Sequence, residues 1–186
     1  MRKLTLLTFQ TLDGVMQAPG LPNEDTTGGF TTGGWAKSYW DEVMEQVGRE
    51  AMSEPYDLLL GRKTYELFSV HNSSSDSPFN DMTKYVVTNT LTKLDWQNST
   101  AIFGDIAVEI KKLKQQSGPL IQVHGSWQLI QELLKHNLVD ELRLWTFPLI
   151  IGSGKRLFTD ITLSQNISLI KSEACKNGVI MSLYSI

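Results

Sequence analysis

The pattern of apolar and polar positions predicts strands that alternate with amphipathic helices. Short apolar runs predict strands over 3–12, 57–61, 85–88 and 120–123, and another that opens at Leu142. Apolar residues at helical spacing predict helices over 35–52, 62–68 and 105–116, and one around 129–134. Near the end, 168–174 and 179–184 read as a hairpin turned by Lys176-Asn177-Gly178. This alternation favours one α/β domain, with a largely parallel sheet covered on both faces and an antiparallel hairpin at one end.

The most informative segment is 119–158, a buried strand, a tight turn, an amphipathic helix and a second strand that runs into a Gly-rich turn. Its first strand stops at His124-Gly125-Ser126. A strand that ends in Gly and leads into a helix leaves backbone N–H groups free to bind a phosphate. Open α/β sheets bind ligands at the carboxyl ends of their strands. The segment therefore predicts nucleotide binding.

Two further strand ends carry glycine or polar residues. Gly61-Arg62-Lys63-Thr64 leads into a helix, and Arg62 adds a guanidinium that grips a phosphate at two points. Thr88-Asn89-Thr90 offers hydroxyl and amide groups that suit a phosphate or a ribose. Taken singly, each also fits an ordinary turn with a solvated basic pair or with common turn residues. Three such strand ends together favour a ligand site.

A long Gly- and Thr-rich stretch, 13–34, separates the first strand from the helix over 35–52, and a loop of this length is usually functional. Asp13 opens the loop, while Asp41 and Glu45 share a helix face beside Trp40. Next to Trp35 and Trp40, such a carboxyl group is expected to have a raised pKa and to relay protons. The alternatives are an Asp-Gly turn for Asp13 and a solvated helix surface for the other two acids.

Several classes of function are excluded. A net charge of −3 gives no general attraction to nucleic acid or to an anionic membrane. Cys175 is the only cysteine, which excludes an internal disulfide and a multi-cysteine metal site, and three histidines make a metal cluster improbable. Residues 152–156 fail the phosphate-loop pattern, and no Gly-x-Ser-x-Gly occurs. The N-terminal apolar run is too short for a signal peptide, so we expect a cytoplasmic soluble protein.

At these residues the chain resembles the dihydrofolate reductase superfamily. It is closer to the branch similar to the C-terminal reductase domain of the bifunctional riboflavin-biosynthesis deaminase/reductase. The resemblance covers nearly the whole length and is carried by TLDG (11–14), LLLGRKTYE (58–66), KYVVTNTL (84–91), VHGSWQLIQELLKHNLVDELRL (123–144) and FPLIIGSGKRLF (147–158). The zinc deaminase half of the riboflavin enzyme is absent, because its paired cysteines cannot be formed. One departure is His124-Gly125, where dihydrofolate reductases have a Gly-Gly pair.

The resemblance implies a single three-layer dihydrofolate reductase-like domain over 1–186, with about eight strands, that binds NADPH. It implies cofactor contacts by Gly61, Arg62, Thr64, Thr88, Asn89, Gly125, Ser126 and Trp127. It implies that Asp13, Trp35 and Trp40 contact the substrate. It assigns catalytic roles to Asp13, Asp41 and Glu45, and it implies no metal site. The implied substrate is a small heterocycle, pterin-like or resembling 5-amino-6-(5-phosphoribosylamino)uracil. A non-catalytic nucleotide- or pterin-binding protein is the alternative.

Two more expectations follow. Arg62 and Lys63 beside Thr88 predict a preference for NADPH over NADH, since the 2′-phosphate adds a charge that a guanidinium pairs with. Trp145 and Phe147, large apolar residues on a strand near the end of the sheet, suggest a homodimer that covers them. The alternative is that both rings pack inside the monomer.

Overall fold

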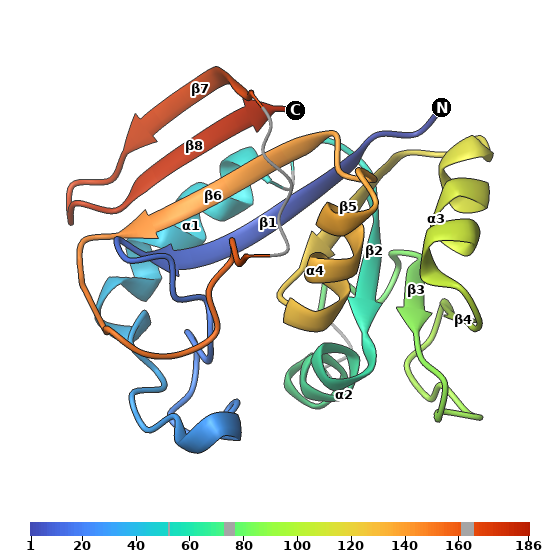
Figure 1. Cartoon of the computed structure of the whole chain (residues 1–186), viewed down its shortest axis with the longest axis horizontal. Coiled ribbons are helices and arrows are strands. Elements are labelled where there is room, and N and C mark those ends of the chain that lie inside the picture. Colours follow the sequence, from blue (N-terminus) through green and yellow to red (C-terminus); the bar gives the residue numbers. More distant parts are fainter. Residues whose placement is uncertain (52, 73–76, 161–165) are drawn as a thin grey trace.

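The computed structural model describes residues 1–51, 53–72, 77–160 and 166–186. One eight-stranded sheet runs through the molecule in the order β4-β3-β2-β5-β1-β6-β8-β7 (Figure 1). Its strands are β1 (Leu4–Thr11), β2 (Tyr56–Gly61), β3 (Lys84–Val87), β4 (Ser99–Ile102), β5 (Leu120–His124), β6 (Glu141–Phe147), β7 (Ser168–Ala174) and β8 (Ile180–Ser185).

The first six strands in chain order run parallel to one another, and among the described strands only the β6–β8 and β8–β7 pairs are antiparallel. β1 lies between β5 and β6, and its apolar residues are buried on both faces, as is typical of a central parallel strand. The predicted α/β fold, a mostly parallel sheet of about eight strands with an antiparallel C-terminal hairpin, is confirmed.

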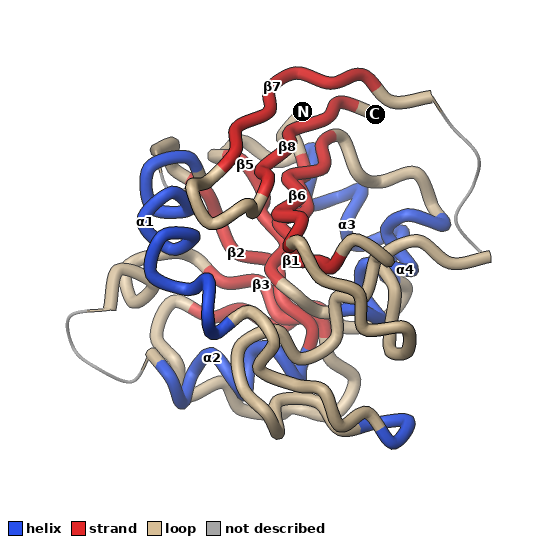
Figure 2. Tube along the Cα trace, turned by 90° about the vertical axis from the view of Figure 1, so that its left-hand side faces the viewer, coloured by secondary structure: helices blue, strands red, loops and turns tan. Residues whose placement is uncertain are grey.

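Helices cover both faces of the sheet (Figure 2). On one face, α3 (Ile106–Gln115) and α4 (Trp127–Lys135) pack their apolar sides against β1, β5 and β6. On the other face, α1 (Trp40–Glu50) covers β1, β6 and β8, and α2 (Arg62–His71) covers β2 and β3. Because helices cover both faces of the sheet, we expect a ligand to bind at the carboxyl ends of the parallel strands.

Some predicted elements differ in detail. The helix expected from Trp35 begins only at Trp40, after a short 3-10 turn over Lys37–Tyr39, because Trp35 is pulled into the core beneath the long loop. The strand β4 was not predicted, since its sequence STAI is short and half polar. The Ser-, Asp- and Pro-rich composition of 72–78 predicts a polar loop, of which residues 73–76 lie outside the described residues.

Two further observations concern the core and the helices. Trp145 and Phe147 have no exposed surface and pack in the core against α1, so the monomer already buries them and they give no reason for a dimer. Among the described residues, no helix combines the length and apolar character that crossing a bilayer requires.

Candidate functional site

Two strand-to-helix turns meet at the carboxyl edge of the sheet. β2 ends at Gly61 and leads into α2, while β5 ends at His124 and leads through Gly125 and Ser126 into α4. Because β2 and β5 are parallel neighbours, both turns lie at the same edge. The Gly61 N–H donates a 2.9 Å hydrogen bond to Ser126 Oγ, and that hydroxyl donates to the His124 carbonyl oxygen at 3.0 Å. The Ser126 side chain thus ties the two turns into one unit.

The backbone of the second turn takes a conformation that favours glycine. Gly125 has φ +52°, and Ser126 has φ 62° and ψ 52° in the left-handed region. A β-carbon added to Gly125 would lie 3.5 Å from the Thr64 side chain of the neighbouring turn. At Ser126 the cost of the left-handed conformation is offset by the two hydrogen bonds of its hydroxyl. A small, open turn results, with Gly125 exposed to solvent.

The helices that leave these turns lack side-chain caps. Among the described residues, no side chain accepts a hydrogen bond from the first turn of α2 or α4. By contrast, α3 is capped by Asp105, whose carboxylate accepts from the Val108 N–H at 2.9 Å. The first N–H groups of a helix have no intrahelical partner. At α2 and α4 they are therefore available to an anion, and the helix dipole favours a negative charge there.

The third predicted strand end stands beside this pair, since β3 is the next parallel neighbour of β2. Thr88 is buried, and its hydroxyl oxygen accepts from the N–H groups of Thr90 and Leu91 at 3.1 and 3.0 Å. Thr88 is thus a turn residue, while Asn89 is exposed. On α2, the Arg62 guanidinium contacts both carboxylate oxygens of Glu66 at 3.0 Å and remains 40% exposed.

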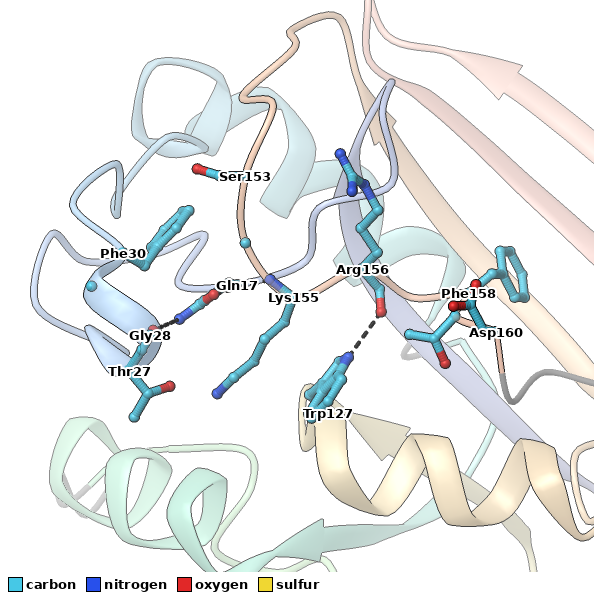
Figure 3. A pocket seen from close by; sticks show the side chains of 13 residues that line it. Gln17, Thr27, Gly28, Phe30, Trp127, Ser153, Lys155, Arg156, Phe158 and Asp160 are labelled. Carbon is cyan, nitrogen blue, oxygen red and sulfur yellow. Dashed lines mark hydrogen bonds between the residues drawn. The ribbon is translucent and has the colours of Figure 1, made fainter.

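A cavity of about 760 Å³ opens beside the start of α4 (Figure 3). It is lined by the long loop, by Trp127 and by the segment that follows β6: Gln17, Thr27, Gly28, Gly29, Phe30, Trp127, Ser153, Gly154, Lys155, Arg156, Phe158, Thr159 and Asp160. The Lys155 side chain extends between Thr27 and Trp127 (Figure 3). The Gly-rich turn after β6 contributes Ser153, Gly154, Lys155 and Arg156 to this lining. In the sequence, the Gly-Lys-Arg composition of this turn is the feature that could have identified it as part of the cavity lining.

Hydrogen bonds hold the walls of this cavity together. Trp127 Nε1 donates to the Arg156 carbonyl oxygen at 2.8 Å (Figure 3). The Gln17 side chain accepts from the Lys155 N–H and donates to the carbonyl oxygens of Asp25 and Thr27, all at 3.0 Å. The Lys155 ammonium pairs with the Asp25 carboxylate at 2.5 Å and lies 5.6 Å from the centre of the Trp127 ring. One network therefore joins the long loop, α4 and the segment after β6.

Asp13 joins the start of the long loop to the turn that follows β6. Its carboxylate accepts from the Thr11 hydroxyl at 2.5 Å, from the Gly152 N–H at 2.8 Å and from the Ile151 N–H at 3.2 Å, with Arg156 at 3.4 Å. The Thr11 hydrogen bond is the main cause that lowers the pKa of Asp13 to about 2, and the two backbone donors add to it. The expected raised pKa of Asp13 is therefore wrong, because donors rather than tryptophan rings surround the carboxylate.

The other acids and tryptophans predicted for the site lie around α1. Asp41 is exposed, and Glu45 is exposed and pairs with Arg49 at 2.5 Å. Trp35 is 9% exposed, donates from Nε1 to the Gln17 carbonyl oxygen at 2.8 Å and packs edge-to-face on Phe147. Trp40 is 36% exposed and packs edge-to-face on Phe9. The cleft in which both tryptophans were expected to surround an acid does not form, because Trp35 turns into the core.

His124 is buried at the end of β5 and stacks on Tyr56, with the rings of Phe68 and Phe79 edge-on. Burial, together with the charge of Arg143, lowers the pKa of His124 to about 4. The imidazole is therefore neutral at physiological pH and serves as a strand-end residue, as expected. Within the described part of the chain, no group of three or more His, Cys, Asp or Glu side chains is arranged to hold a metal ion.

Comparison with known proteins adds a family and a fold. The family described as RibD C-terminal domain matches residues 2–181. Two Bacillus subtilis (strain 168) proteins, named Uncharacterized protein YyaP and Uncharacterized protein YwjB, are both 28% identical to this chain. The first alignment covers 171 residues, 86% of this chain and 89% of the relative; the second covers 134 residues, 70% and 76%.

Two solved structures share the fold. A protein from Shewanella sp. PV-4, described as a putative riboflavin biosynthesis protein, has a TM-score of 0.66 and 22% sequence identity; the match covers 100% of this chain and 98% of that protein. The dihydrofolate reductase from Enterococcus faecalis, complexed with NADP(H) and RAB-propyl, has a TM-score of 0.64 and 14% sequence identity. The match covers 98% of this chain and 95% of that protein. The fold is that of the dihydrofolate reductase superfamily.

Proposed function

The chain belongs to the RibD C-terminal domain family, and from this premise we propose that it is an NADPH-dependent reductase of a small heterocyclic substrate. A reductase-type family supports the class of activity. The single observation that carries the cofactor assignment is the junction of the Gly61 and Gly125-Ser126 turns. There, two uncapped helix N-termini and an exposed glycine face one edge of the sheet.

This junction suits the phosphates of a dinucleotide. The Gly61 N–H is already bound to Ser126, so the anion donors are the first N–H groups of α2 and α4. Gly125 lets a ligand approach the backbone closely, because it carries no β-carbon. The side chains predicted to assist are Thr64, which lies across from Gly125, and Trp127 at the start of α4. When bound, NADPH supplies the hydride, while the chain orients it.

The preference for NADPH over NADH rests on Arg62, with Asn89 at the neighbouring strand end. Arg62 is half-exposed at the first position of α2, and among the described residues its guanidinium pairs only with Glu66 of its own helix. Such a surface pair is weak and exchanges readily. A 2′-phosphate offers a stronger, doubly charged acceptor to the same guanidinium. Thr88 supports this region through its turn hydrogen bonds rather than through a free hydroxyl.

We assign the substrate to the region between the long loop and α4. The cavity there combines aromatic rings, Phe30, Phe158 and Trp127, with the basic side chains of Lys155 and Arg156. Such a lining suits a flat heterocycle that carries polar or anionic substituents. Trp40, half-exposed beside Phe9, is the substrate-contacting tryptophan that we retain.

Hydride reduction of a C=N or C=O group also requires a proton. Asp13 is ionised at physiological pH, so its proposed role is to position the loops around the cavity. Glu45 is held by Arg49 on the exposed side of α1. We therefore propose Asp41, at the start of α1, as the side-chain acid, with water as the competing source.

The alternative function, a non-catalytic nucleotide- or pterin-binding protein, is favoured by one specific observation. The best placed carboxylate, Asp13, is committed to Thr11 and to the backbone of the Gly152 turn and carries no proton to give. A protein that only binds its ligand needs no proton donor.

The decisive experiment follows NADPH oxidation by absorbance across a panel of pterins, pyrimidines and flavin precursors. A reductase oxidises one NADPH per substrate reduced, and Asp41→Asn then lowers turnover while calorimetry finds NADPH affinity unchanged. Ligands that bind without NADPH oxidation identify the non-catalytic alternative. If Asp41→Asn keeps full turnover on a confirmed substrate, the proton comes from water.

A further inference from the structure

The sheet face that α1 and α2 cover carries polar side chains between two separate apolar clusters. On β5, Gln122 and His124 face this side, because the residues that alternate with them belong to the apolar cluster beneath α3 and α4. Arg143 of β6 lies on the same side for the same reason, and Tyr56 of β2 packs in the cluster beneath α2. We call these four residues the polar seam.

Hydrogen bonds connect three members of the polar seam. Arg143 and His124 flank the same residue of β1, Leu7. The Arg143 guanidinium donates to Gln122 Oε1 at 3.3 Å, and Gln122 Nε2 lies 2.9 Å from His124 Nε2. The reverse orientation of the Gln122 amide would set its NH₂ group against the guanidinium, so the amide accepts from Arg143 and donates to the imidazole. Both polar atoms of Gln122 are therefore used within the seam.

The groups of the seam that lack partners are donors. A guanidinium has five N–H groups, and among the described residues Arg143 makes the bond to Gln122 and no ion pair. Tyr56 is 4% exposed, and its hydroxyl, near Gln122 and Arg143, has no hydrogen-bond partner of normal geometry in the described part of the chain. Native proteins rarely leave buried polar groups without a partner. The seam therefore calls for an acceptor.

The acids around Arg143 do not supply this acceptor. Glu141 and Glu50 are each bound by a lysine ammonium, at 2.7 and 2.6 Å, and Glu54 is exposed. Burial lowers the pKa of Arg143, although these three acids oppose the shift. An arginine nevertheless keeps its charge in a protein. Arg143 is thus a largely buried cation whose neighbouring carboxylates are engaged elsewhere or lie in solvent.

From these observations we infer that the polar seam binds the carboxylate of a small organic acid, held by the Arg143 guanidinium and the Tyr56 hydroxyl. The planar guanidinium matches a carboxylate through two parallel hydrogen bonds, and the hydroxyl adds a third donor. Arg143 is partly exposed, so a ligand can reach it from solvent. The site lies on the face of the sheet opposite α4 and shares no residue with the cavity beside that helix.

The test titrates the full chain with sodium acetate, succinate and benzoate, by calorimetry and by thermal unfolding. Sodium chloride and sodium phosphate at the same ionic strength are the references. We expect at least one of the three carboxylates to bind once per chain and to raise the unfolding temperature above that in chloride or phosphate. If none of them does, or if all five salts act alike, the inference is overturned.

Two substitutions locate the binding. Tyr56→Phe keeps the ring stacked on His124 and removes a hydroxyl without a partner, so the free protein keeps its stability while the carboxylate binds roughly tenfold more weakly. Arg143→Lys keeps the charge but not the planar fork and also weakens binding by about tenfold. Arg49→Lys, at an exposed arginine on α1, is the matched control and binds like the wild type.

Circular dichroism establishes that each variant is folded, and calorimetry with NADPH shows that the proposed cofactor site is unaffected. If Arg143→Lys fails to fold, Tyr56→Phe alone decides. Carboxylate binding as tight in Tyr56→Phe as in the wild type overturns the inference, as does an equal loss in Arg49→Lys. Because NADPH takes no part in this binding, the outcome is independent of the proposed reductase activity.

Discussion

At the scale of single residues, Asp13 shows how one side chain fixes the relation of two loops. It lies two residues after the end of β1, and its carboxylate accepts hydrogen bonds from the backbone of the Gly152 turn, 139 positions further along the chain. It also accepts from Thr11 within its own segment. These donors stabilise the charged form of the carboxylate, so the same bonds that position the loops remove Asp13 from proton transfer.

We expect Asp13→Asn to lower the free energy of unfolding by about 1–3 kcal/mol at neutral pH, the usual loss for hydrogen bonds to a charged group. The folded pKa, about 2, lies below the ordinary 3.8, so the charge stabilises the protein above pH 3.8 and this contribution disappears as the pH falls towards 2. Urea unfolding of both proteins at decreasing pH checks this. Asp41→Asn, at an exposed position, is the control. If the difference in unfolding free energy between the wild type and Asp13→Asn does not become smaller as the pH falls, the lowered pKa of Asp13 is contradicted.

His124 predicts a second pH effect. Its folded pKa of about 4 lies below the ordinary 6.5, so protonation favours the unfolded chain. Stability from this residue is complete above pH 6.5 and declines between 6.5 and 4, by at most about 1.4 kcal/mol per pH unit. His124→Phe keeps a ring beside Tyr56 and is expected to flatten this part of the urea-unfolding profile. If the unfolding free energy of His124→Phe changes with pH between 6.5 and 4 as steeply as that of the wild type, other groups cause this pH dependence.

At the scale of elements, the turn between β5 and α4 has a left-handed backbone and is also part of the proposed phosphate site. Gly125→Ala forces a side chain into φ +52° and is expected to cost about 1 kcal/mol of stability. The matched control is Gly48→Ala on α1, where nothing lies within 4 Å of the added carbon and φ is helical, so stability rises by about 0.5–1 kcal/mol. Thermal unfolding measures both. Equal effects of the two substitutions would show that the Gly125 turn is not special.

The sequence predicts such local elements well, because strand and helix periodicities are properties of neighbouring residues. The run from Leu120 to Leu134 shows both periodicities and the glycine between them, and it folds as expected. The bond from Gly61 to Ser126 spans 65 positions and depends on β2 lying beside β5, which no local pattern encodes. Trp35 likewise reads as the first residue of a helix, but packing against Phe147 draws it into the core.

At the scale of the whole molecule, the order of the strands creates the candidate site. The parallel neighbours β3, β2 and β5 bring their carboxyl ends to one edge, so three turns that are far apart in the sequence become adjacent. Among the described residues, the antiparallel hairpin of β7 and β8 lies at the opposite end of the strand order, with β7 as its last strand. The proposed ligand site therefore lies away from the hairpin end of the sheet.

The most direct test of the account is calorimetric titration of the protein with NADPH and with NADH. We predict one NADPH per chain, bound more tightly than NADH by about 1–3 kcal/mol, the contribution of a charged hydrogen bond. Arg62→Ala removes this difference, whereas Arg49→Ala, at another exposed arginine paired with a glutamate four residues away in its helix, leaves it unchanged. Equal binding of both cofactors with no effect of Arg62→Ala, or no binding of either, would contradict the proposed cofactor site.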